Sequence, residues 1–110
     1  MTHQMNLNDL PFEMIRSGKK TIELRLNDEK RRAIKVGDHI LFNDCLEVEV
    51  VALHAYPDFE ALYAALPILS LGYTPEEEAT ASPDDMLAYY TREQITRYGA
   101  LGIEVRVVSQ

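Results

Sequence analysis

A short segment near the N-terminus, from Ser17 to Arg25, sets the strongest limit on how this chain can fold. Its second residue is Gly18, and glycine readily adopts the left-handed backbone that ends a helix. Polar and apolar side chains then alternate with the period of two that is typical of a β-strand. The apolar face holds Ile22 and Leu24, and the polar face holds Thr21, Glu23 and Arg25. This predicts a helix end followed at once by a strand with two chemically different faces.

The polar face of this strand has two interpretations. It is either an ordinary solvated surface with a neighbouring Glu–Arg pair, or a cluster that recognises a ligand. Lys20 can hold a phosphate, or act as a base when its ammonium group is desolvated. Glu23 can orient that lysine, accept a hydrogen bond from a base edge or serve as a general acid–base, and Arg25 supplies a planar fork of donors. The set suits nucleotide recognition more than it defines a reaction.

The distribution of charge is more informative than its sum. The chain carries a net charge of −7, which by itself argues against a nucleic acid partner. Residues 16–35, however, hold eight basic and three acidic side chains, a local charge of +5 within a remainder of −12. A local basic patch of this kind can bind phosphate, whereas a long duplex would be repelled by the rest of the surface. We therefore expect a short single strand, an RNA loop or a nucleotide as the partner.

Length and composition indicate one domain over residues 1–110. Cys45 is the only cysteine, so an intrachain disulfide is excluded and a reducing compartment is expected. No apolar run approaches the ~20 residues of a membrane span. We expect a cytoplasmic protein that does not bind membranes. The three histidines are scattered and the five glycines are not grouped, so we expect neither a metal nor another cofactor.

The rest of the sequence predicts strands at both ends of the chain with helices between them. A first strand spans residues 3–7, a short helix residues 12–17, and the charged segment 27–35 is a helical turn or an ordered loop. Residues 39–42 and 46–55 read as strands. In the second of these, Val51 and Leu53 make both faces apolar, which predicts that a helix covers its far half. Asp58 caps a helix that ends before Pro67.

Three helix starts follow in quick succession, at Thr74, Ser82 and Thr91. Acidic side chains near these starts complement the helix dipole and so have a structural reason to be there. Met86, Tyr89 and Tyr90 are expected to pack inward. The final strand spans residues 101–108.

The ordered set of motifs resembles the ASCH-domain family of the PUA-like superfamily. The resemblance rests on Gly18-Lys19-Lys20-Thr21-Ile22-Glu23-Leu24-Arg25, on Asp28-Glu29-Lys30-Arg31-Arg32 and Val36-Gly37-Asp38, and on Tyr98-Gly99 before the last strand. It covers nearly the whole chain as a single ASCH domain. It implies an α+β fold, a small and mostly antiparallel β-barrel with helices packed on the outside. It also implies binding of RNA or a nucleotide, in RNA metabolism, through a basic and polar cleft.

The ligand-binding residues expected from the motifs lie in the basic segment. They are Lys19, Lys20, Thr21, Glu23, Arg25, Lys30, Arg31 and Arg32. The sequence leaves catalysis undecided, and Lys20 and Glu23 would be the catalytic pair if the protein is an enzyme. A ribonuclease that needs no metal, with Lys20 as its base, and a plain protein-interaction module remain as alternatives.

A hydrolase of modified nucleosides is a further alternative, because one branch of the family is similar to amidohydrolases of N4-acetylcytidine. In that branch a lysine that corresponds to Lys20 activates a threonine three residues later. This chain has Glu23 at that position, so the mechanism does not carry over intact. The branch also uses a glutamate ahead of a late helix, for which Glu77 or Glu78 is the candidate.

Overall fold

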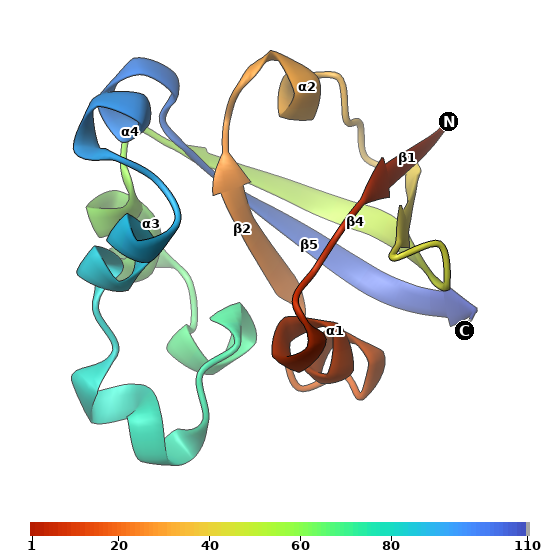
Figure 1. Ribbon diagram of the computed structural model, residues 1–110, viewed down its shortest axis with the longest axis horizontal. Coiled ribbons are helices and arrows are strands. Elements are labelled where there is room, and N and C mark those ends of the chain that lie inside the picture. Colours follow the sequence, from red (N-terminus) through yellow and green to blue (C-terminus); the bar gives the residue numbers. More distant parts are fainter. Residues whose placement is uncertain (110) are drawn as a thin grey trace.

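Within residues 1–109, which the computed structural model describes, five strands form a single mixed sheet (Figure 1). The strands are β1 (Thr2–Met5), β2 (Ile22–Leu26), β3 (His39–Phe42), β4 (Leu46–Tyr56) and β5 (Ala100–Ser109). Their order is β1-β3-β4-β5-β2; β1 pairs with β3 in parallel and the other pairings are antiparallel. The sheet curls along the long strands β4 and β5 into a half-barrel (Figure 1). The predicted α+β fold is confirmed.

Apolar side chains pack on both faces of this sheet. The first core joins β1, β3, β4 and β5 to α1 (Asp9–Arg16), whose Ile15 is 1% exposed. The second core lies on the opposite face of β2, where Ile22 and Leu24 pack against Phe59 and Leu62 of α3 (Phe59–Ala65). Strand β2 is therefore covered on both sides. Its predicted alternation is correct, but neither face is simply solvated.

A β-bulge in β4 changes which residues face the first core. Val50 pairs with Val105, but Ala52 pairs with Glu104, so Val51 is an extra residue without a partner in the ladder. Before the bulge the even-numbered Val50 packs in the first core; after it the odd-numbered Leu53 does. Val51 itself remains 38% exposed. The prediction that Val51 and Leu53 form a second apolar face is therefore wrong, because the bulge shifts the phase of the strand. The helix α3 (Phe59–Ala65) does pack at the far end of β4, where Tyr56 contacts the second core.

α1 begins at Asp9, three residues before the predicted helix start, whereas the later helices begin where the sequence predicted. Asp58 caps α3 by accepting a hydrogen bond from the Ala61 N–H at 2.8 Å, and Asp28 caps the short α2 (Glu29–Arg32) in the same way. Thr74, Ser82 and Thr91 each form a capping box. The first two open only short 3₁₀ helices, η2 (Pro75–Thr80) and η3 (Pro83–Ala88), whereas Thr91 opens α4 (Arg92–Tyr98). Starts eight to nine residues apart leave room for about two turns each.

Candidate functional site

The polar face of β2 carries a network of three charged side chains. Lys20 Nζ lies 2.9 Å from Glu23 Oε1, and Arg25 Nε donates to Glu23 Oε2 at 2.7 Å. Arg25 Nη2 also donates to the backbone carbonyl of Asn6 at 2.9 Å, which ties β2 to the segment before α1. Each oxygen of the carboxylate is thus held by a different cation.

Glu23 is the one charged residue that is fully buried among residues 1–109, with 4% of its surface exposed. Its strand position explains this burial. Glu23 pairs with Ile103 of β5 and so points to the same face as that residue, which belongs to the first core. A buried carboxylate is tolerated only when cations or other donors compensate it. Lys20 and Arg25 therefore have a structural role in holding Glu23, whatever else they do.

These three side chains line one wall of a cleft of about 620 Å³. The neighbouring wall comes from the β1–α1 connection and the first turns of α1, including Asn8, Leu10 and Met14. The opposite wall comes from the end of α3, the turn after η1 (Ile68–Leu71) and the residues of η3. In Figure 1, α1 and these helical segments flank the start of β2. Pockets of about 300–1,000 Å³ accept small molecules, so the cleft has room for a nucleotide.

A chain of hydrogen bonds runs along the opposite wall. Tyr73 donates its hydroxyl hydrogen to Asp85 Oδ2 at 2.7 Å, and the hydroxyls of Tyr63 and Tyr73 lie 2.7 Å apart. Burial raises the pKa of both phenols above the ordinary value, so both stay protonated near neutral pH. Tyr63 therefore donates to Tyr73, which donates to Asp85. The Asp85 carboxylate also accepts a hydrogen bond from the Ser82 N–H at 3.2 Å.

Sequence reasoning did not place this second wall in the site. Tyr63 lies in the helix that Asp58 caps, and the acidic residues after Ser82 have a structural reason at a predicted helix start. The structure agrees with these local roles, because Tyr63 is 8% exposed and Asp85 completes a capping box. The same side chains nevertheless line the cleft. The sequence feature that could have indicated this wall is Gly72-Tyr73, a turn between two helical segments that orients the Tyr73 side chain.

Two further tyrosines give the cleft aromatic surface. Tyr90 stacks on Phe59, with ring centroids 6.2 Å apart and planes within 4°. Burial raises the pKa of Tyr90, whose hydroxyl lies near the charges of Arg25 and Glu23. Tyr89 was expected to pack inward, but it is 64% exposed at the rim. Leu10, from the opposite side of the cleft, is similarly exposed at 71%.

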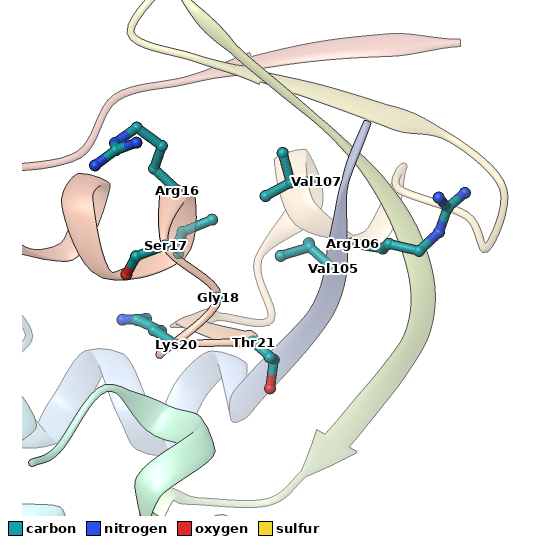
Figure 2. Close-up of a pocket in the computed structure, with 9 residues that line it drawn as sticks. Arg16, Ser17, Gly18, Lys20, Thr21, Val105, Arg106 and Val107 are labelled. Atoms are coloured by element: carbon teal, nitrogen blue, oxygen red, sulfur yellow. The ribbon is translucent and has the colours of Figure 1, made fainter. Parts of the chain in front are cut away.

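The remaining residues of the predicted site lie outside this cleft. Lys19 is exposed on the turn before β2. Thr21 lines a smaller cavity of about 310 Å³ between the end of α1 and β5, with Lys20 shared between the two cavities. In Figure 2 the Thr21 and Lys20 side chains point in different directions, and Arg106 extends away from both. Thr21 is therefore not part of the Lys20–Glu23–Arg25 network.

The basic triplet on α2 is largely engaged with its own helix. Arg31 Nη1 lies 3.1 Å from Asp28 Oδ2, and Arg32 Nε donates to the Asn27 carbonyl at 2.8 Å. Lys30 is exposed. Arg31 Nε is buried without a hydrogen-bond partner in the described part of the chain. None of the three lines the cleft.

The late glutamates have structural positions. Glu77 accepts a hydrogen bond from the Thr74 N–H at 2.9 Å as part of a capping box, and Glu78 is exposed on the same short helix. Neither lines the cleft, whereas Asp85 does. Among residues 1–109, no group of three His, Cys, Asp or Glu side chains is arranged to hold a metal ion. No helix within the same residues has the length and apolar character needed to cross a bilayer.

Comparison with known proteins points to one family. The sequence matches the ASCH domain over residues 5–109. Among curated proteins, none matches it. The crystal structure of hypothetical protein PH0355 is similar, with 34% identity and a TM-score of 0.86, covering 98% of this chain and all of that one.

Two further solved structures share the fold. The solution structure of protein PF0455 from Pyrococcus furiosus is 31% identical, with a TM-score of 0.78, and each chain is covered completely. A crystal structure of a mutant of ZmASCH from Zymomonas mobilis has a TM-score of 0.62 at 13% identity. That match covers 98% of this chain and 75% of the other, and at this identity it shows a common fold alone.

Proposed function

Because the chain belongs to the ASCH-domain family, a PUA-like family associated with RNA, we propose that it binds RNA or a nucleotide in the cleft beside β2. The binding would serve RNA metabolism. One observation carries the proposal. The lysine, glutamate and arginine of the family-like motif meet on one wall of a concave site large enough for a nucleotide.

The two walls offer complementary kinds of contact. Lys20 and Arg25 supply charged N–H donors, which bind phosphate and base acceptors strongly. Tyr89 and Tyr90 supply aromatic rings against which a base can stack, and such stacking is worth about 1–3 kcal/mol per base. An unpaired base is reachable for these rings, whereas a base within a duplex is not. The proposal is therefore for a single strand or a free nucleotide.

The charge of the protein limits the length of the ligand that it can hold. The remainder of the chain outside residues 16–35 carries a charge of −12, which repels an extended polyanion. Only Lys20 and Arg25, among the basic side chains of residues 1–109, line the larger cleft. Binding with few phosphate contacts has a shallow dependence on salt.

The test is to measure binding of short single-stranded RNAs by fluorescence anisotropy at several salt concentrations. Lys20→Met should weaken binding about tenfold or more, because it removes a charged donor from the cleft. Lys35→Met is the matched control, because Lys35 is an exposed lysine that does not line the cleft. Thermal unfolding of both variants is measured to check that the fold is intact. The proposal fails if RNA and nucleotides do not bind at low salt, or if both variants weaken binding equally.

A further inference from the structure

We infer that the Lys20–Glu23–Arg25 network recognises a phosphodiester, which carries one negative charge, in preference to a terminal phosphate or the edge of a neutral base. This inference rests on the proposed function and specifies the group that the cleft receives. The inference places an internal phosphodiester linkage of an RNA strand against the wall formed by Lys20, Glu23 and Arg25. Three observations support this inference: the free donors of the network, the charge of the network, and the carboxylate on the opposite wall of the cleft.

The wall formed by Lys20, Glu23 and Arg25 presents hydrogen-bond donors to a ligand. Both oxygens of Glu23 are occupied by cations, so this carboxylate is not directed at a base edge. Lys20 Nζ is held in an ion pair with Glu23 Oε1 and has three N–H donors in all, and Arg25 Nη1 has no hydrogen-bond partner within the described residues. A ligand atom that reaches this wall must therefore accept hydrogen bonds. The sequence-based idea that Glu23 reads a base edge does not suit this geometry.

The charge of the network selects among acceptors. Two cations and one carboxylate leave a formal charge of +1, in a region where the Lys20 and Arg25 side chains are only 11% and 14% exposed. A single negative charge neutralises this site. A terminal phosphate carries about −1.5 to −2 at neutral pH and would leave an excess of buried negative charge. A neutral acceptor would leave the positive charge uncompensated.

The opposite wall strengthens this selection. The Asp85 carboxylate lines the same cleft and is held in place by Tyr73 and Ser82. It opposes any additional negative charge in the cleft, and so disfavours a dianion more than a monoanion. The exposed ring of Tyr89 and the partly covered ring of Tyr90 remain available for the bases on either side of the linkage.

The experiment compares ligands whose 5′ position carries no phosphate, a phosphate monoester or a phosphodiester. The probes are the four common ribonucleosides, their 5′-monophosphates and the methyl esters of those monophosphates, with binding measured by isothermal titration calorimetry at pH 8. The methyl ester is a phosphodiester with a single nucleoside. We expect it to bind at least about tenfold more tightly than the nucleoside, and more tightly than the monophosphate.

Two variants test the charge argument directly. Lys20→Met removes one positive charge and should abolish the advantage of the methyl ester over the nucleoside. Glu23→Gln raises the charge of the network and should shift the preference toward the monophosphate. Lys35→Met should change neither preference. If Glu23→Gln does not fold, the dinucleotide UpU and its neutral methylphosphonate analogue, measured on the natural protein, test whether the negative charge of the linkage is required; equal binding of the two would overturn the inference.

Each outcome separates this inference from the proposed function. Equal affinity for the nucleoside and its methyl ester would show that the network reads a neutral acceptor, and tightest binding of the monophosphate would show a site for chain ends. Either result overturns the inference while leaving nucleotide binding in place. If no probe binds and RNA does not bind either, the proposed function itself is wrong.

Discussion

The side chain of Lys20 passes so close to Gly72 that a Cβ atom on Gly72 would lie 2.9 Å from the Lys20 Cδ atom. Gly72 follows η1 and has a φ of +108°, a backbone conformation that favours glycine. The far end of the lysine is tied to Glu23, so its stem cannot move aside without disturbing that ion pair. The same turn positions Tyr73, which donates a hydrogen bond to Asp85 on the other wall. Gly72 thus lies where the two walls of the cleft meet.

Gly72→Ala should therefore destabilise the protein by more than backbone strain alone. Gly37→Ala is the matched control, because Gly37 has a φ of +94° and a Cβ there would meet nothing within 4 Å. The strain common to both is about 1–2 kcal/mol. We expect a larger loss in the free energy of unfolding for Gly72→Ala, measured by urea denaturation. In a Lys20→Ala background the two losses should become similar. An excess loss that survives Lys20→Ala would contradict the role of the lysine stem.

The bulge in β4 predicts opposite outcomes for two adjacent valines. Val50→Asp should lower the free energy of unfolding by more than about 4 kcal/mol or prevent folding. Val50 is 1% exposed, so the introduced carboxylate would be buried without a partner. Val51→Asp should cost at most about 1 kcal/mol, because that side chain is partly exposed at the bulge. Chemical denaturation measures both. Similar losses at the two positions would contradict the difference in burial between Val50 and Val51.

Acid should weaken the contact between β1 and the turn before β3. A hydrogen bond with His3 and the Lys35 backbone N–H lower the pKa of Asp38 from 3.8 to about 2. A carboxylate with a depressed pKa in the folded state stabilises the fold above its unfolded pKa, and this stability is lost as the pH falls through the folded pKa. The contribution is therefore complete above pH 4 and disappears toward pH 2. Asp38→Asn should flatten the stability profile in this window, as followed by thermal melts; an unchanged profile would exclude the contact.

We expect the natural protein to release little or no cytidine from N4-acetylcytidine. Position 23 lacks a hydroxyl nucleophile, and each oxygen of Glu23 is held by a cation. The Thr21 hydroxyl belongs to the neighbouring cavity, and Glu77 is engaged in a capping box. Incubation of the purified protein with N4-acetylcytidine, followed by chromatography, measures the reaction. Efficient release that is lost in both Lys20→Ala and Glu23→Ala would show that Glu23 is catalytic after all.

The sequence by itself determined the local features of this protein. Alternation along a strand has a period of two, so the separation of Ile22 and Leu24 from Glu23 and Arg25 depends only on neighbouring residues. Helix caps are also local, because the side chain at the cap bonds to a backbone group two or three residues away. Asp58, Thr74, Ser82 and Thr91 accordingly begin helical segments where the sequence predicts them.

Only the tertiary structure decided what each strand face meets. Glu23 is buried because β5 places Ile103 beside it, a pairing between residues 80 positions apart in the sequence. The phase change at Val51 depends on the register of β4 against β5 and leaves no local signal in an apolar strand. The same holds for Asp85: its capping role is local, but only the folded chain brings it into the cleft that Lys20 also lines. Contacts distant in sequence set these positions, and no periodicity records them.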